Sequence, residues 1–240
     1  MRNVAVIIPA YVPDPSLIDY VKQLINEVRL VIVIDDGNTD DQAALFETLA
    51  GYEQVEVLHH LINRGKGVGL RTAYDYLLKH HREIEGIVTT DADGQLLVKD
   101  VLHVADVLLS SDNNWVLGVR AFDHEYTPRK NKLGNQTTSR LFQWLFGTYY
   151  QDTQTGLRAF RREQLLLMAS IPGQKFEYEM NVLIAMTLLE ASYAEVPIET
   201  VYVENQPSHY HVLNDSLAIA GEMIHAKRHP ECLLGGGTVR

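Results

Sequence analysis

Short runs of apolar, mostly β-branched residues alternate with longer segments whose apolar residues recur every three or four positions. The runs predict strands at 4–8, 30–34, 55–58, 86–90 and 115–119, and the longer segments predict helices at about 15–28, 40–50, 67–81 and 98–110. Strands that alternate with helices of this length form βαβ units. We therefore expect an α/β fold with a mostly parallel central sheet and helices on both faces.

The second half of the chain has a less regular pattern. It predicts helices at 129–146, 163–169 and 177–192, and short strands near 157–161, 193–196 and 200–203. Pro197 separates the last two strands and indicates a sheet edge or a bend. A final amphipathic helix is expected from Asn214 or Asp215 to about residue 228. We expect one domain over residues 1–230 and a disordered tail over 231–240.

Charge and cysteine content limit the possible partners. The formal net charge of −10 argues against bulk nucleic-acid binding, which requires a basic face. The single cysteine, Cys232, cannot form an internal disulfide, and this fits a reducing compartment. The sequence has no recognisable secretory signal and no apolar stretch near the ~20 residues that a membrane span needs. These features favour a cytoplasmic location.

Basic residues crowd the stretch 120–162, against the acidic balance of the whole chain. They are Arg120, Arg129, Lys130, Lys132, Arg140, Arg158, Arg161 and Arg162. Such a cluster is either a solvated surface or a local site for phosphate groups.

Carboxylates follow two of the predicted strands where each strand ends. Asp35 and Asp36 follow the second, and Asp91, Asp93 and Gln95 follow the fourth. The carboxyl ends of parallel strands share one sheet edge, where ligands bind. Carboxylates gathered there repel each other, and a divalent metal is the simplest compensation. Mg²⁺ and Mn²⁺ prefer oxygen ligands, so we predict a metal at Asp91, Asp93 and Gln95. The alternative is a plain turn, for which this segment is also well suited.

Three further features of this edge suggest contacts to a nucleotide. Asp36 is a candidate for a nucleoside hydroxyl or base contact, as a carboxylate after the second strand is in dinucleotide-binding folds; its alternative role is a turn cap. Tyr11 is a candidate for stacking on a base, or it packs in the ordinary way. The glycine-rich stretch Asn63–Gly69 opens a predicted helix, where glycines and the charges of Arg64 and Lys66 favour an anion. Its alternative is a flexible loop and helix start.

Four motifs in this order resemble the family-2 glycosyltransferases of GT-A fold. They are Ile7-Ile8-Pro9-Ala10-Tyr11, Val33-Ile34-Asp35-Asp36-Gly37, Asn63-Arg64-Gly65-Lys66-Gly67 and Thr90-Asp91-Ala92-Asp93-Gly94-Gln95. Later segments are similar to the branch that acts on polyprenyl phosphates such as dolichyl phosphate. These segments are Asp152-Thr153-Gln154-Thr155-Gly156-Leu157-Arg158, Phe176-Glu177-Tyr178-Glu179-Met180, Glu195-Val196-Pro197-Ile198 and Ser208-His209-Tyr210.

The resemblance implies inverting transfer from a UDP- or GDP-sugar to a lipid phosphate, with possible peripheral contact to the inner face of a membrane. It implies that Pro9, Tyr11 and Asp36 touch the nucleoside. It further implies that Asp91, Asp93 and Gln95 hold Mg²⁺ or Mn²⁺ and that Arg120 faces phosphate. Asp152 is expected in the sugar and acceptor pocket, and Glu177 and Glu179 near the acceptor.

Alternatives remain for the acceptor and for the roles of these side chains. A phosphate acceptor is already anionic and needs little general-base help, whereas a hydroxyl of a saccharide or glycolipid would need Asp152 or Glu179 as base. Asp152 is alternatively a salt-bridge partner of Arg158. Glu177 and Glu179 are alternatively a solvated first helical turn, and His209 either a ligand to metal or phosphate or a polar loop residue. A non-catalytic nucleotide-sugar-binding module is a further alternative.

Overall fold

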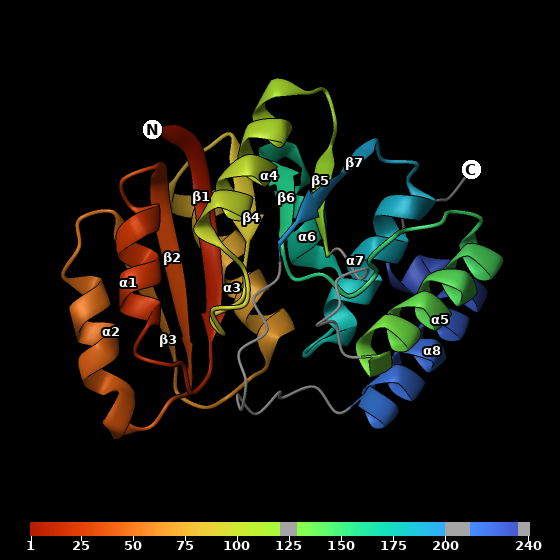
Figure 1. Cartoon of the computed structure of the whole chain (residues 1–240), viewed down its shortest axis with the longest axis horizontal. Helices are drawn as coiled ribbons and strands as arrows, with labels where there is room; N and C mark the ends of the chain where they lie inside the picture. Colours follow the sequence, from red (N-terminus) through yellow and green to blue (C-terminus); the bar gives the residue numbers. More distant parts are fainter. Residues whose placement is uncertain (121–128, 200–211, 235–240) are drawn as a thin grey trace.

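A computed structural model describes residues 1–120, 129–199 and 212–234 (Figure 1). The predicted strand at 200–203 and His209 lie outside these residues. Over 1–120 the strands are β1 (Arg2–Ala10), β2 (Val28–Asp36), β3 (Val55–His60), β4 (Gly86–Thr89) and β5 (Trp115–Arg120). The helices between them are α1 (Leu17–Leu24), η1 (Asp40–Gln42), α2 (Ala43–Ala50), α3 (Lys66–His80) and α4 (Val98–Ser110). All five predicted strands and four predicted helices are confirmed, although α1 is shorter than 15–28 because β2 already begins at Val28.

The second half adds two strands and further helices. They are α5 (Arg129–Phe146), β6 (Arg158–Arg161), η2 (Arg162–Gln164), α6 (Leu165–Ser170), α7 (Glu177–Leu188), β7 (Tyr193–Ile198), α8 (Val212–Arg228) and η3 (Pro230–Cys232). The predicted helix 177–192 is too long, because Glu190 adopts a positive φ of 52° that a helix cannot continue through.

The seven strands form one sheet in the order β3-β2-β1-β4-β6-β5-β7. The pairs β1–β2, β1–β4, β2–β3 and β5–β7 are parallel, while β6 is antiparallel to both β4 and β5. The mostly parallel sheet is therefore confirmed. Strand order reverses between β1 and β4, and an open α/β sheet binds its ligands at such a switch point.

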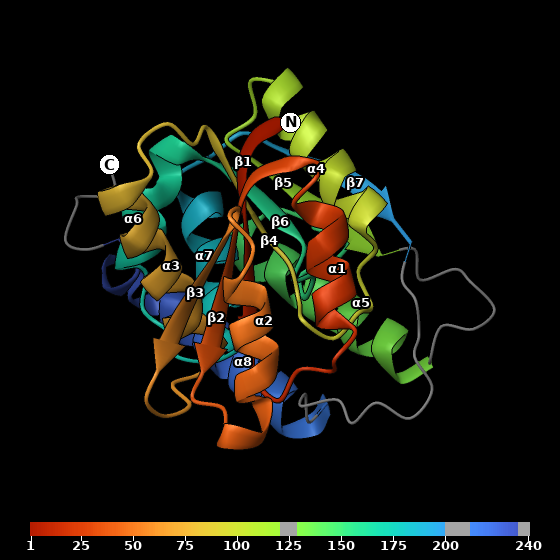
Figure 2. The same ribbon diagram turned by 90° about the vertical axis from the view of Figure 1, so that its left-hand side faces the viewer.

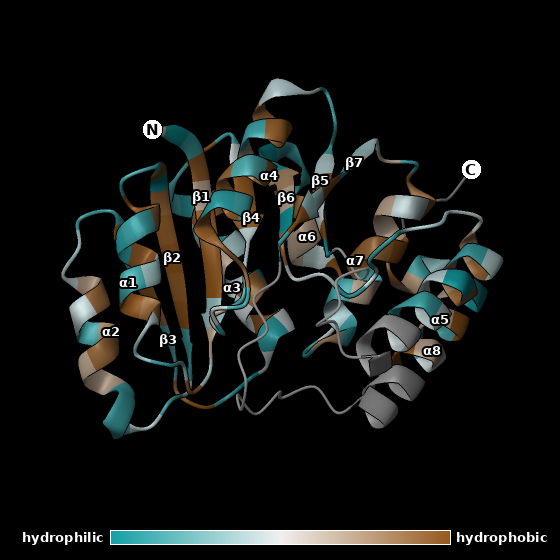
Figure 3. Ribbon diagram, viewed as in Figure 1, coloured by the Kyte–Doolittle hydropathy of each residue, from teal (hydrophilic) through white to brown (hydrophobic). Residues whose placement is uncertain are grey.

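Helices cover both faces of the sheet (Figure 2). Alternate residues of β1 separate the two layers: Ala5 and Ile7 join the cluster under α3, α6 and α7, while Val4, Val6 and Ile8 join the cluster under α1, α2 and α4. The central strands are accordingly apolar along most of their length (Figure 3). Burying each such side chain stabilises the fold by about 1.5–3 kcal/mol, so the sheet is a rigid base for the loops at its edge.

Pro197 does not interrupt a strand, contrary to the expected break. It lies inside β7, where its Cα is in register with Val119 of β5. Because β7 is the last strand of the sheet, a proline that lacks an N–H is tolerated on it. The expected sheet edge at this point is confirmed.

The expected tail boundary at residue 231 is too early. Pro230–Cys232 forms a short 3₁₀ turn, and Leu233 is buried in the core beside α8. Within the described residues, no helix combines the length and apolarity that crossing a membrane requires.

Candidate active site

The loops that leave β1, β2, β4 and β5 meet at one edge of the sheet, around the switch point. Since β6 runs antiparallel to its neighbours, the loop that enters it, residues 151–157, arrives at the same edge. A small cleft there, of about 40 Å³, is bordered by both halves of the chain. Its lining residues are Asp91, Asp93, Gln95, Leu96, Arg120, Gln154, Thr155 and Gly156.

The segment after β4 forms a tight turn that presents its carboxylates to this cleft. Gly94 has a φ of +72°, and Asp93 Oδ1 accepts the backbone N–H of Gln95 at 3.0 Å. Loss of hydration within the loop raises the pKa of the Asp93 carboxyl, and the negative charge of Asp91 raises it further. The turn interpretation and the ligand interpretation are therefore compatible, because the turn is what brings the carboxylates together.

Gly156 allows Asp91 to enter the cleft. A Cβ added to Gly156 would lie 2.2 Å from Asp91 Oδ2, a distance that no side chain could keep. Thr89 Oγ1 donates a hydrogen bond to the Gly156 carbonyl at 3.0 Å and ties this loop to β4. The absence of a side chain at Gly156 thus fixes one oxygen of Asp91 against backbone and leaves Oδ1 facing Lys66.

Lys66 is the nearest positive charge to the Asp91 carboxylate. Its Nζ lies 2.5 Å from Asp91 Oδ1 and 3.0 Å from Glu179 Oε1. Burial lowers the pKa of Lys66, but the charges of Asp91 and Glu179 outweigh burial and raise the pKa above its ordinary value. Lys66 is therefore a permanent cation here, and part of the compensation that the sequence assigned to a metal comes from the protein itself.

Two glycines place Lys66 at the first position of α3. Gly65 has a φ of +90°, and an added Cβ would lie 2.6 Å from the carbonyl oxygen of Gln174. A Cβ on Gly67 would lie 2.5 Å from Cβ of Tyr178. The glycine-rich stretch is therefore packed against the start of α7, and it leads directly into α3, as the helix-start interpretation expects.

Asp36 is buried behind the glycine-rich stretch. Its carboxylate accepts the N–H groups of Arg64 at 2.9 Å and Gly65 at 2.8 Å, and it contacts His60 Nδ1 at 2.6 Å. These contacts reach a distant loop and do not cap the turn that follows β2, where Asp35 Oδ1 accepts the Asn38 N–H at 3.0 Å. They hold the loop that carries Lys66, so any effect of Asp36 on a nucleoside would act through that loop.

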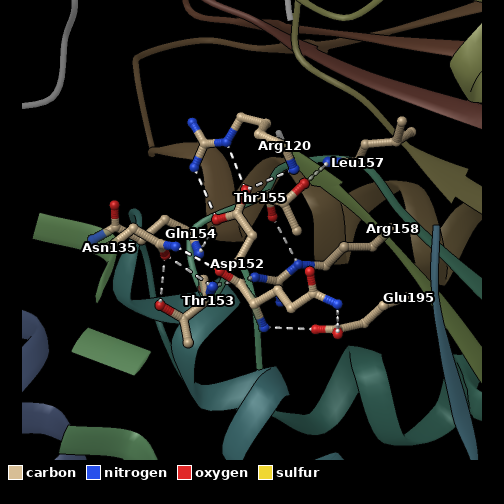
Figure 4. A network of polar contacts seen from close by, with 10 residues as sticks. Arg120, Asn135, Asp152, Thr153, Gln154, Thr155, Leu157, Arg158 and Glu195 are labelled. Atoms are coloured by element: carbon tan, nitrogen blue, oxygen red, sulfur yellow. Dashed lines mark hydrogen bonds and ion pairs between the residues drawn. The ribbon is translucent and has the colours of Figure 1, made fainter. Parts of the chain in front are cut away.

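Asp152 is fully buried and paired with Arg120 in two-point geometry (Figure 4). Arg120 Nε and Nη2 donate to its two oxygens at 2.6 and 2.9 Å, and the N–H groups of Arg120 and Gln154 donate at 3.3 and 3.0 Å. Asp152 is thus a salt-bridge partner, as one interpretation held, but of Arg120 and not of Arg158. The pairing also means that Arg120 reaches the cleft from a fixed position.

Arg158 has a structural role that the sequence did not reveal. It is buried, and its guanidinium donates to the carbonyl oxygens of Thr155 at 2.9 Å and Glu179 at 2.6 Å. Asn135 of α5 is also buried, and its Oδ1 accepts the Thr153 N–H at 3.1 Å (Figure 4). Together they fasten the loop 151–157 to α5 and α7.

The two acidic residues at the start of α7 have different surroundings. Glu177 Oε1 accepts the N–H groups of Gln174 and Lys175 at 2.8 and 3.1 Å, so it stabilises the turn just before the helix. Glu179, by contrast, is nearly buried and faces Lys66. The helix-turn interpretation fits Glu177, while Glu179 lies beside the Lys66 ammonium that also contacts Asp91.

The basic stretch 120–162 does not form one phosphate site. Arg161 and Arg162 donate to carbonyl oxygens near the opposite edge of the sheet, for example those of Asn113 at 2.9 Å and His81 at 2.6 Å. Arg158 is buried, and Arg140 is exposed on α5. Among the described side chains of this stretch, Arg120 is the basic one at the cleft. The basic residues are dispersed because β6 runs away from the cleft, so that Arg161 and Arg162 lie at its far end.

At the end of β1, Pro9 is half-buried and Tyr11 is 46% exposed. Tyr11 therefore remains accessible at the edge where a base would stack. The described residues contain no group of three or more His, Cys, Asp or Glu side chains close enough to hold a metal. The carboxylates of Asp91 and Asp93 and the amide of Gln95 do line one cleft. These oxygen ligands fit Mg²⁺ or Mn²⁺, whose remaining coordination positions are filled by water or phosphate oxygens.

Comparison with known proteins agrees with this architecture. Residues 5–165 match the sequence profile described as glycosyl transferase family 2. The chain is 28% identical to a UDP-N-acetylglucosamine–dolichyl-phosphate N-acetylglucosaminyltransferase of Methanococcus voltae, over 85% of this chain and 87% of the relative. It is 30% identical to a dolichyl-phosphate hexose transferase of Haloferax volcanii, over 72% and 71%.

Solved structures give the same result for the fold. Glucosyl-3-phosphoglycerate synthase from Mycobacterium tuberculosis, crystallised with Mn²⁺, UDP and phosphoglyceric acid, superposes with a TM-score of 0.64 at 20% identity. The superposition covers 96% of this chain and 78% of that one. The fold is thus that of the GT-A glycosyltransferases, and the profile match covers most of the chain. The protein belongs to glycosyl transferase family 2.

Proposed function

We propose that this glycosyltransferase moves a sugar from a UDP- or GDP-sugar to a polyprenyl phosphate, with inversion at the anomeric carbon. The observation that carries the donor side is the cleft where Asp91, Asp93 and Gln95 lie beside Arg120. The dolichyl-phosphate transferases named above support the acceptor class.

Asp91, Asp93 and Gln95 would hold Mg²⁺ or Mn²⁺ in this cleft. When bound, such an ion neutralises charge on the departing nucleoside diphosphate. Lys66 and Arg120 are cations beside the same cleft, and their charges would stabilise the charge on the departing diphosphate. Tyr11 and Pro9 would line the nucleoside, and Asp36 would support it through the loop of Lys66.

In the transfer step, an oxygen of the acceptor phosphate attacks the anomeric carbon. The new carbon–oxygen bond forms as the bond to the diphosphate oxygen breaks, and that electron pair stays on the diphosphate. The attacking oxygen carries no proton to remove, because the second pKa of a phosphate monoester is about 6.

Both carboxylates that could serve as a base are already paired with a cation. Asp152 accepts four hydrogen bonds, two of them from the Arg120 guanidinium, and Glu179 faces Lys66. Proton removal from a hydroxyl acceptor would require breaking one of these contacts. This pairing favours a phosphate acceptor, with Asp152 positioning Arg120, and Glu179 positioning Lys66.

The test compares a polyprenyl phosphate with the matching polyprenol and a soluble saccharide, across a panel of UDP- and GDP-sugars. We expect transfer to the phosphate alone, loss with EDTA, and recovery with Mn²⁺ or Mg²⁺. Asp93→Ala should fold and lose activity. Transfer to the polyprenol or saccharide hydroxyl would replace the proposed acceptor. If no donor is turned over under any condition, the protein is a nucleotide-sugar-binding module.

Access to a lipid acceptor implies contact with a membrane surface, which we place at its cytoplasmic face. The α5 helix exposes Trp144 (80%) and, four residues earlier, Arg140. A tryptophan beside a cation is typical of the bilayer interface. Vesicles with anionic lipid should therefore co-sediment the protein in a salt-sensitive way, and Trp144→Ser should weaken this. Equal sedimentation of the wild type and Trp144→Ser would show that this face of α5 does not contact the membrane.

A further inference from the structure

The Lys66 ammonium contacts one oxygen of Asp91, a carboxylate that lines the cleft. Its Nζ is 2.5 Å from Asp91 Oδ1, and its side chain is 14% exposed. We infer that Lys66 and a divalent cation compete for Asp91, so that the protein binds the cation well only when a diphosphate gives Lys66 another anionic partner. The inference rests on the metal site proposed above.

Asp91 packs closely against Gly156. A Cβ added to Gly156 would lie 2.2 Å from Oδ2 and 2.9 Å from Oδ1, so the glycine backbone borders the carboxylate on that side. Thr89 fixes that backbone through the Gly156 carbonyl. A cation that enters the cleft therefore meets an Asp91 whose oxygen Oδ1 already contacts an ammonium.

The backbone of Lys66 is equally confined. Gly65 and Gly67 pack against Gln174 and Tyr178 so closely that neither position has room for a Cβ. The N–H of Val68 also donates to the Gln174 carbonyl at 3.2 Å. Lys66 can yield Asp91 to another cation only by swinging its flexible side chain, and two cations on one carboxylate oxygen repel each other strongly.

Glu179 is the positioning residue for that swing. Its Oε1 is 3.0 Å from the Lys66 ammonium and comes from a different element, α7. If the Lys66 ammonium moved away from Asp91, it would keep its contact with Glu179. Glu179 therefore lowers the free energy needed to separate Lys66 from Asp91. The diphosphate of a donor adds further negative charge, and cation and nucleotide then bind with positive coupling, which is reciprocal by linkage.

The test measures Mn²⁺ affinity without nucleotide, from the free Mn²⁺ signal in electron paramagnetic resonance. Lys66→Met and Lys66→Gln should bind Mn²⁺ about tenfold more tightly than wild type, because a like charge is removed. Glu179→Gln should bind it about threefold more weakly. In the Lys66→Met background, Glu179→Gln should have a much smaller effect, as a double-mutant cycle would reveal.

Lys175→Met is the matched control, since Lys175 is exposed in the loop beside Gly65 and forms no ion pair within the described residues. Its Mn²⁺ affinity should equal that of wild type. UDP should strengthen Mn²⁺ binding more in wild type than in Lys66→Met. If the wild type binds Mn²⁺ in the presence of UDP but neither Lys66 variant binds Mn²⁺ more tightly than wild type, the proposed competition is wrong and the metal site stands. Absence of Mn²⁺ binding by every protein, with and without UDP, would overturn the metal site itself.

Discussion

Two cation–carboxylate pairs lie at the same edge of the sheet and differ in their hydrogen-bond geometry and in their exposure to solvent. Arg120 holds the fully buried Asp152 with two guanidinium hydrogen bonds, and two backbone N–H groups complete the set. Lys66 touches Asp91 at a single oxygen, in a cleft where the Asp91 side chain keeps 32% of its exposure, and is shared with Glu179.

The difference separates a fixed part of the site from an exchangeable one. A guanidinium fork matched to a carboxylate is geometrically specific and is not readily replaced. An ammonium is a point charge on a flexible stem, so it can leave one oxygen for another. We therefore expect substitutions at Arg120–Asp152 to change stability, and substitutions around Asp91 to change ligand binding and catalysis.

The largest effect should come from Asp91→Asn. The amide keeps the shape of the side chain but removes the charge that both Lys66 and a metal require. Removing such electrostatic stabilisation costs roughly 10³-fold in kcat. The measurement is steady-state transfer at saturating donor, together with a urea unfolding curve. An unfolding midpoint that falls as far as that of an Arg120 variant would remove the contrast between the two pairs.

Arg120→Met should have the next largest effect, and mainly on stability. It leaves the buried Asp152 carboxylate with backbone donors only, and removing one partner of a buried pair costs about 3–5 kcal/mol. Because Arg120 is 23% exposed and water can partly replace it, we expect about 2–3 kcal/mol. Urea denaturation would measure the loss, with the exposed Arg140→Met as control. Equal stability of the two variants would show that the Arg120–Asp152 pair is not structural.

Gly156→Ala should reduce Mn²⁺ affinity and transfer about 30-fold, because its methyl group would displace Asp91 from the cleft. Gly134→Ala is the control, since an added Cβ there would have no neighbour within 4 Å among the described residues, and alanine is favoured in a helix. Comparison of Mn²⁺ titrations for both variants would check the effect. An active Gly156→Ala enzyme would mean that Asp91 has more freedom than the packing implies.

The smallest effect is expected for Asp152→Asn. Asparagine keeps acceptor oxygen for the backbone donors but weakens the hold on Arg120, so transfer should fall about tenfold. Since Asp152 removes no proton in the proposed step, no new pH dependence should arise between pH 6 and 8. The measurement is the pH profile of kcat with polyprenyl phosphate. A wild-type profile that rises with a carboxylate-like pKa and disappears in the variant would make Asp152 a base.

The sequence predicted the fold and the cleft carboxylates because both follow from local patterns. Asp91, Asp93 and Gln95 lie next to a strand that its own residues define. The partner of Asp152 was not predictable in this way. Arg158 is nearer along the chain, but β6 runs antiparallel between β4 and β5 and brings Arg120 to Asp152 instead.

The orientation of Asp35 and Asp36 was also hidden. In a strand with one wet face, alternation of polar and apolar residues would show which aspartate points inward. Both faces of β2 are covered, and Ile34 and Val33 on its opposite faces are equally apolar. The alternation of residues therefore does not show which of the two aspartates is buried. The choice of Asp36 as the buried member became clear only from His60, on the neighbouring strand β3.

The antiparallel strand β6 also determines the order in which the sheet can form as the chain is synthesised. When residue 120 leaves the ribosome, β1 to β4 can already pair, but β5 has no neighbour, since its partners β6 and β7 are encoded later. The apolar segment Trp115–Val119 must therefore stay unpaired until about forty more residues have followed, roughly 2–8 s at 5–20 residues per second. That interval exposes a hydrophobic strand to wrong partners. The arrival of Arg158–Arg161 then joins β5 to β4 and brings the two halves of the cleft together, before β7 completes the sheet.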